Sequence, residues 1–196
     1  MDPDRPACSE VDECTSWALA ARDGDALAAA AFIRATQAET WRFVASLVDT
    51  ESADDLTQET YLRAFSSLHR FEGRSSLRTW LLVIARRVCA DAVRAQRRRP
   101  VTLVGDEHLE ALAGADGTDR VAEDAGVADL LGRLDADRRE AFALTQLLGL
   151  SYAEAAEVAG CPVGTIRSRV ARARGDLVAS LGQGIDDDGR GDAALA

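Results

Sequence analysis

The stretch LGLSYAEAAEVAGCPVGTIRSRVARAR, residues 148–174, carries the signals of two short helices joined by a tight turn. Ser151 followed by Glu154 matches a capping box, in which the serine accepts a bond from a first-turn N–H and the glutamate reaches back to the cap. Gly160 and Pro162 then interrupt the pattern, and proline suits the first turn of a following helix. This stretch therefore predicts a helix-turn-helix.

The second helix of this pair has an apolar face and a basic face. On a helical wheel its apolar residues form one stripe, which predicts burial of Val163, Ile166, Val170, Ala173 and Leu177. The rest of the helix presents hydroxyls and guanidiniums, which bind phosphates and base edges in a major groove: Thr165, Arg167, Ser168, Arg169 and Arg172. A solvated arginine face has the same composition, but the preceding capped helix and turn favour DNA recognition.

Upstream of this pair, Asp137 followed by Glu140 has the same capping pattern and predicts one more helix, which ends before Gly149. Residues 15–97 contain no proline and show apolar spacing near the helical period. We therefore expect an all-α fold with two small helical domains, at 15–97 and 127–181. Residues 98–126 are acidic and glycine-containing, which predicts a flexible linker, and residues 182–196 are predicted to be a disordered acidic tail.

The charge is distributed unevenly. The chain of 196 residues has a formal net charge of −10, yet residues 70–99 contain nine arginines against the two acids Glu72 and Asp91. Two basic segments in an acidic chain indicate local contact with a polyanion, while the surrounding negative charge discourages indiscriminate binding.

The longer basic segment begins as a glycine-containing loop and continues as a helix. Trp80 lies on the apolar face of this helix, which favours a core position, although an aromatic ring beside a basic loop can also stack on unpaired bases. Just upstream, ADDLTQETYLRAF, residues 53–65, places several carboxylates on one helix. No metal-ligand spacing or nucleophile accompanies them, so acid–base catalysis is not indicated.

Several classes of protein are disfavoured by the rest of the sequence. Its four cysteines are scattered without CxxC spacing, which argues against a zinc site or a disulfide framework. No stretch has the length of a membrane span, and the acidic N-terminus does not resemble a secretory signal. We expect a cytoplasmic protein without cofactor or metal, and not an enzyme.

Three stretches together resemble one family: residues 53–65, residues 148–174, and RFEGRSSLRTWLLVIARRVCADAVR, residues 70–94. They look like the signature stretches of extracytoplasmic-function sigma factors, compact members of the bacterial sigma-seventy superfamily, and they occur in the family's order. The resemblance implies a protein that binds core RNA polymerase, through its beta-prime and beta subunits, and directs it to promoter DNA.

The resemblance also implies roles for individual residues. Docking on the beta-prime clamp coiled coil would involve Asp54, Asp55, Leu56, Gln58 and Glu59. Recognition and melting of the minus-ten element would involve Arg70, Arg74, Ser75, Ser76, Trp80, Arg86, Arg87 and Arg94. The helix-turn-helix would read the minus-thirty-five element through the five polar residues named above. Many members have asparagine at the position of Arg87, so the family's base preference is not carried over at this contact.

Regulation and two other classes of function stay open at the level of the sequence. The regulator would be a separate anti-sigma protein, or the packing of one domain on the other between the acidic helix and the basic final helix. A helix-turn-helix regulator with a dimerisation or sensing domain is the alternative function. A helical protein-interaction module with solvated arginines is a further one.

Overall fold

The computed structural model describes residues 11–71, 75–98 and 130–188, and every regular element in these ranges is helical. The first part contains α1 (Val11–Arg22), α2 (Ala26–Leu47), α3 (Thr50–Ser67), the short helix η1 (Leu68–Arg70) and α4 (Leu77–Arg98). The second part contains α6 (Ala136–Phe142) with its π-helical continuation η2 (Ala143–Leu147), α7 (Tyr152–Ala159) and α8 (Val163–Asp188). The expected all-α fold is confirmed.

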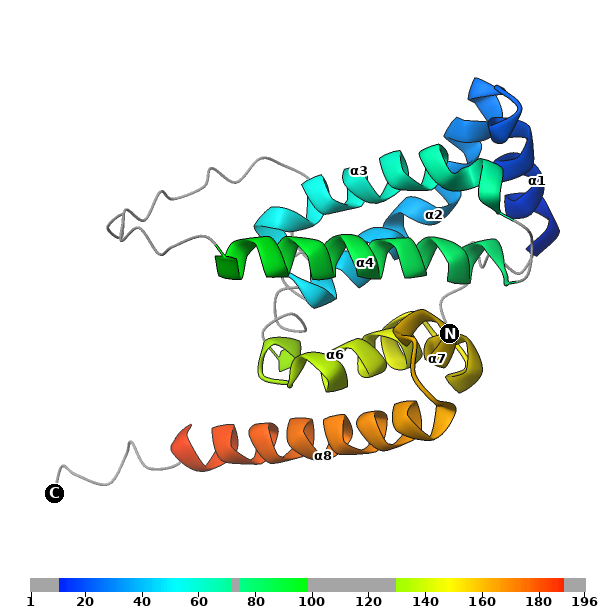
Figure 1. Cartoon of the computed structure of the whole chain (residues 1–196). Helices are drawn as coiled ribbons and strands as arrows, with labels where there is room; N and C mark the ends of the chain where they lie inside the picture. The colour runs from blue at the N-terminus through cyan, green and yellow to red at the C-terminus, as the bar shows by residue number, and fades with distance from the viewer. Residues whose placement is uncertain (1–10, 72–74, 99–129, 189–196) are drawn as a thin grey trace, which may run out of the picture.

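The helices form layers (Figure 1). The long helices α2, α3 and α4 pack side by side, α6 and α7 lie beneath α4, and α8 runs along the other side of α6 and α7. The basic helix α4 therefore belongs to the first part and faces the second.

Short side chains fix where several helices begin. Asp25 caps α2 by accepting from the backbone N–H groups of Leu27 and Ala28, and Asp49 caps α3 in the same way at Ser52. The predicted capping box of Ser151 and Glu154 is confirmed at the start of α7. These local bonds satisfy N–H groups that have no partner within the helix.

The capping pattern of Asp137 and Glu140 was wrong. Asp135 caps α6 instead and accepts from the N–H of Asp137, while the Glu140 side chain bonds Arg86 of α4. Asp135 and Asp137 both lie near the start of α6. Asp135 is the capping residue because Asp137 already lies within the first turn of the helix.

The core of the first part is built on an aromatic cluster. Phe32 of α2 meets Tyr61 and Phe65 of α3 edge-on, with ring centroids 6.1 and 6.0 Å apart. The Tyr61 hydroxyl lies 2.7 Å from that of Thr36, so the buried phenol has a hydrogen-bond partner. One apolar face of α4 closes this core with Leu77, Leu81, Ile84 and Val88.

A second stripe of α4 is also buried, and it joins the two parts of the chain. Leu82, Ala85 and Cys89 share a core cluster with Phe43 of α2 and with apolar residues of the second part, namely Leu144, Leu148, Leu150, Ala155, Ala156, Val158, Ile166 and Val170. Burial raises the pKa of the Cys89 thiol to about 12. The two parts therefore pack together as one body.

The final helix differs from the prediction at both ends. Ile166, Val170 and Ala173 are buried and Leu177 is half-buried, as the stripe predicted, but Val163 is 40% exposed because it lies at the first turn. At the other end α8 continues to Asp188, into the segment 182–196 that was predicted to be a disordered tail. The rest of that segment, and the predicted linker beyond residue 98, lie outside the described residues.

Candidate nucleic-acid and protein interface

The turn between α7 and α8 is set by its backbone. Gly160 closes α7 in the left-handed region, at φ +64°, a conformation that glycine adopts without a steric penalty. The carbonyl of Pro162 then accepts from the N–H groups of Thr165 and Ile166 as α8 begins. The expected helix-turn-helix is therefore present, with α8 as its second helix.

The polar groups of α8 differ in exposure and in their partners, and the Ser168 hydroxyl donates to the carbonyl of Thr165. Arg167, Ser168 and Arg172 are exposed and Thr165 is half-exposed. Arg169, in contrast, forms an ion pair with Asp137 of α6, and its side chain is only 21% exposed. Arg172 has no ion-pair or hydrogen-bond partner among the residues that the structure describes, so it is the better placed of the two to contact DNA.

The loop before α4 holds part of the second basic segment. Arg70 donates to the His69 ring and Ser76 caps the N–H of Thr79, whereas Ser75 is half-buried. The Trp80 ring packs against Phe71 with centroids 5.3 Å apart and is half-buried, so one part of it stays accessible. Arg74 lies outside the described residues.

The arginines of α4 differ in their partners. Arg87 is exposed, and Arg94 pairs with Asp91 on the helix surface, where solvent screens the interaction. Arg86 instead points into the contact between the two parts and pairs with Glu140, whose side chain is 7% exposed. Burial raises the pKa of Glu140, and the hydrogen bond from Arg86 opposes that shift. Arg86 is therefore engaged by the second part of the chain, while 36% of its side-chain surface stays exposed.

A second arginine of α4 also reaches the second part. Arg78 bonds Glu39 of α2, and its guanidinium donates to the backbone carbonyl of Leu148 at 2.5 Å. The two parts are therefore held by Arg78 and Arg86 as well as by the shared core. The main contacts between the two parts are those of α4 with α7 and of α2 with α6. A pairing of the acidic α3 with α8, which the charge pattern suggested, is not among these main contacts.

The five predicted docking residues of α3 are not equivalent. Asp54 accepts a hydrogen bond from the Trp41 indole at 2.7 Å, and Glu59 pairs with Arg63 at 2.7 Å. Leu56 is half-buried against both core clusters. Asp55 and Gln58 are exposed, and neither has a side-chain partner among the described residues.

Sequence reasoning did not single out Leu62 or Trp41. Leu62 is 60% exposed on α3, one helical turn beyond Gln58 and Glu59, and therefore extends the same face. Trp41 lies on α2 beside α3. Periodicity could have found Leu62, but nothing in the sequence connects Trp41 with Asp54.

Two further features bear on the class of protein. Within the described ranges, no group of three or more histidine, cysteine or acidic side chains is arranged to hold a metal ion. In the same ranges, no helix combines the length and apolar character needed to cross a bilayer.

Comparisons with known proteins agree with this arrangement. Residues 32–99 match the family described as Sigma-70 region 2, and residues 125–177 match Sigma-70, region 4. The ECF RNA polymerase sigma factor SigC of Mycobacterium tuberculosis is 56% identical over 174 residues, which cover 87% of this chain and 92% of the relative. EcfG of Rhodopseudomonas palustris, another ECF RNA polymerase sigma factor, is 38% identical over 76% of this chain and 82% of its own.

Solved structures show the same fold. CnrH, in complex with the cytosolic domain of CnrY, matches with a TM-score of 0.68 and 28% identity, over 88% of this chain and 99% of that chain. The sigma factor RpoE from Bartonella quintana, in complex with the anti-sigma factor NepR, matches with a TM-score of 0.58 and 31% identity, over 74% and 91%. The chain, with both sigma regions in order and a relative that is 56% identical along most of its length, therefore belongs to the ECF RNA polymerase sigma factors.

Proposed function

We propose that this sigma factor binds core RNA polymerase through α3, opens the minus-ten element with the loop before α4 and α4 itself, and reads the minus-thirty-five element with α8. The observation that carries the proposal is the placement of exposed arginines on two helices, Arg87 on α4 and Arg172 on α8, in the two family regions. Guanidiniums on an exposed helix face neutralise phosphates and can bond guanine in a major groove.

The work of such a protein requires binding energy and no bond chemistry. Holding an unstacked base in a pocket offsets the few kcal/mol that unstacking costs, so melting needs no catalytic residue. We therefore assign no enzymatic activity to the chain. Its partners are core polymerase and promoter DNA, and it works in the cytoplasm, where both are found.

The packing of the two parts supports a closed state of the free protein. Arg86 is one of the predicted minus-ten contacts, and it is bonded to the buried Glu140. Moving the second part away from α4 would release this guanidinium from Glu140 and make it fully available to DNA. An anti-sigma partner, of the kind bound to RpoE in the Bartonella quintana complex, would then shift the balance between this closed state and an open state in which the two parts are separated.

Run-off transcription tests this function. Core polymerase from a GC-rich bacterium is incubated with a library of random upstream sequences, with and without the protein. We expect transcripts that depend on the protein and share two spaced sequence elements. Operator binding without polymerase, and no transcripts with it, would instead favour a helix-turn-helix regulator.

Replacing Arg172 with alanine tests the role of α8. If this exposed arginine makes a bidentate base contact, its loss should weaken use of promoters with a minus-thirty-five element by about 1–3 kcal/mol. The measurement is run-off transcription from matched promoters that keep or lack that element. Arg22→Ala removes an equal charge from α1 and should leave the ratio unchanged. Equal loss on both promoters would assign Arg172 to backbone contact or to folding.

A further inference from the structure

The hydrogen bond between Trp41 and Asp54 connects two helices at the proposed docking surface. The indole nitrogen of Trp41 on α2 donates to a carboxylate oxygen of Asp54 on α3, at 2.7 Å. Asp54 belongs to the acidic motif, yet one of its oxygens is engaged within the protein. The bond holds the indole ring in one orientation at the surface, where a half-buried tryptophan would otherwise sample several rotamers.

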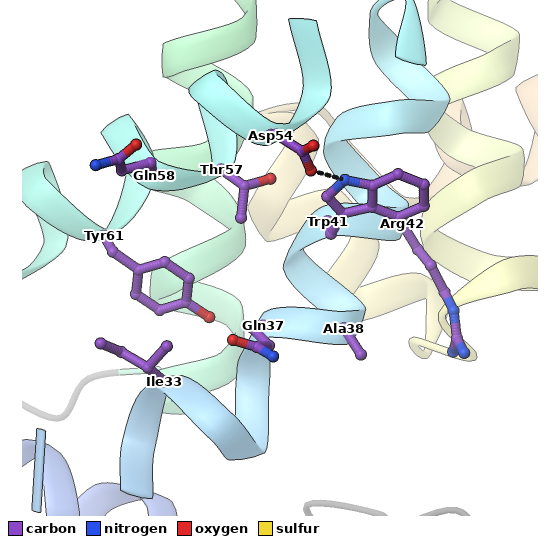
Figure 2. A pocket seen from close by; sticks show the side chains of 9 residues that line it. All are labelled: Ile33, Gln37, Ala38, Trp41, Arg42, Asp54, Thr57, Gln58 and Tyr61. Carbon is purple, nitrogen blue, oxygen red and sulfur yellow. Dashed lines mark hydrogen bonds between the residues drawn. The ribbon is translucent and has the colours of Figure 1, made fainter. Parts of the chain in front are cut away.

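Beside this bond lies a groove of about 620 Å³ between α2 and α3 (Figure 2). Its wall is largely apolar and aromatic, and it is formed by Ile33, Ala38, Trp41 and Tyr61. Gln58 borders it, and the hydroxyl oxygen of Thr57 is buried in it without a hydrogen-bond partner among the described residues. An apolar hollow with a few polar groups is the usual form of a site that receives a side chain of a partner.

The charge around the groove selects the kind of partner. Residues 50–62 of α3 contain the acids Glu51, Asp54, Asp55 and Glu59 and no arginine. Arg42 of α2 is the one basic residue that lines the groove itself. An approaching surface that carries basic side chains is therefore favoured along α3, while its apolar side chain is favoured in the hollow.

We propose that a basic segment of core polymerase inserts an apolar side chain into this groove against Trp41, and that Asp54 is a positioning residue for the Trp41 ring. This inference rests on the proposed function, because the partner is the polymerase. Tryptophan is enriched among the residues that dominate interface energies, since one rigid ring buries a large area. Asp54 acts through its hydrogen bond and Asp55 acts through its charge.

Substituting Asp54 separates these two roles. Asp54→Asn keeps an oxygen that accepts from the indole but removes the charge, whereas Asp54→Ala removes both. Titration of labelled core polymerase should therefore give an affinity for Asp54→Asn within about threefold of the parent, and a loss of about tenfold for Asp54→Ala. Trp41→Ala should lose about 30-fold, as expected for a dominant interface residue. Asp23→Asn and Asp23→Ala, at a side chain that is 70% exposed after α1, are the matched controls.

Each outcome decides a specific point. Equal losses for Asp54→Asn and Asp54→Ala would show that the charge matters and would overturn the positioning role. If Trp41→Ala binds core polymerase as tightly as the parent, docking in the groove is overturned. It is also overturned if the free parent protein is a dimer that Trp41→Ala dissociates, because a second copy of the chain would then occupy the groove. If Trp41→Ala unfolds by circular dichroism, Trp41→Phe keeps a ring without the N–H, and parent affinity for both Trp41→Phe and Asp54→Ala would overturn the proposal. A parent protein that does not bind core polymerase would remove the proposed function itself.

Discussion

Asp55→Arg is expected to abolish association with core RNA polymerase. Asp55 is exposed on α3, and it has no side-chain partner among the described residues, so its charge is available to a partner. Reversing it places a cation against a basic surface, and juxtaposed like charges cost several kcal/mol at an interface. We expect a loss of more than about 100-fold in affinity, and no run-off transcripts.

The single reversal is cleaner than a double one that includes Glu59. Glu59 pairs with Arg63, which also bonds Asp91 of α4, so an arginine at position 59 would face Arg63 and disturb the contact between α3 and α4. Co-migration in gel filtration and titration of labelled core polymerase both measure the effect. Asp23→Arg is the control for an exposed charge reversal outside α3. Parent-like association of Asp55→Arg would remove the docking role of this helix.

Glu140→Arg is expected to separate the two parts of the free protein. The Glu140 carboxylate is buried and bonded to the partly exposed Arg86, so the substitution would place a second guanidinium, at a buried position, beside the first. Breaking a buried ion pair from one side costs about 3–5 kcal/mol, and a like charge adds repulsion. The open state relieves this cost because position 140 then faces water, so its population should rise by more than about 100-fold.

Cys89 reports the opening directly. Its thiol is 2% exposed in the core that joins the two parts, and its pKa of about 12 keeps it protonated at pH 8, so a maleimide should react slowly with the parent. Glu140→Arg should speed modification of Cys89, followed by peptide mass spectrometry, and should increase binding to a promoter fragment because Arg86 is released. Glu140→Gln keeps one acceptor oxygen for Arg86 and adds no charge, so it should stay closer to the parent. Unchanged labelling of Cys89 in Glu140→Arg would contradict the role of this ion pair.

The predictions that rest on residues near one another in the chain agree best with the structure. The capping box at Ser151, the break between helices at Gly160 and the stripe through Ile166 and Val170 depend on residues that are near in the chain, and all of them are present in the structure. The resemblance to the sigma family is confirmed by both family regions and by the mycobacterial relative. The cap predicted at Asp137 failed where Glu140 took a distant partner instead.

The sequence by itself determined the helical fold, the helix-turn-helix and the family, because caps, turns and apolar periodicity act between residues that are near in the chain. Tertiary structure decided which side chains of the same type are engaged within the protein and which are available to bind a partner. Arg169 is tied to Asp137 while Arg172 is exposed, Arg86 is held by Glu140, and Asp54 is held by Trp41. An ion pair or an indole bond forms wherever packing brings two groups together, and periodicity along one helix contains no information about its neighbour.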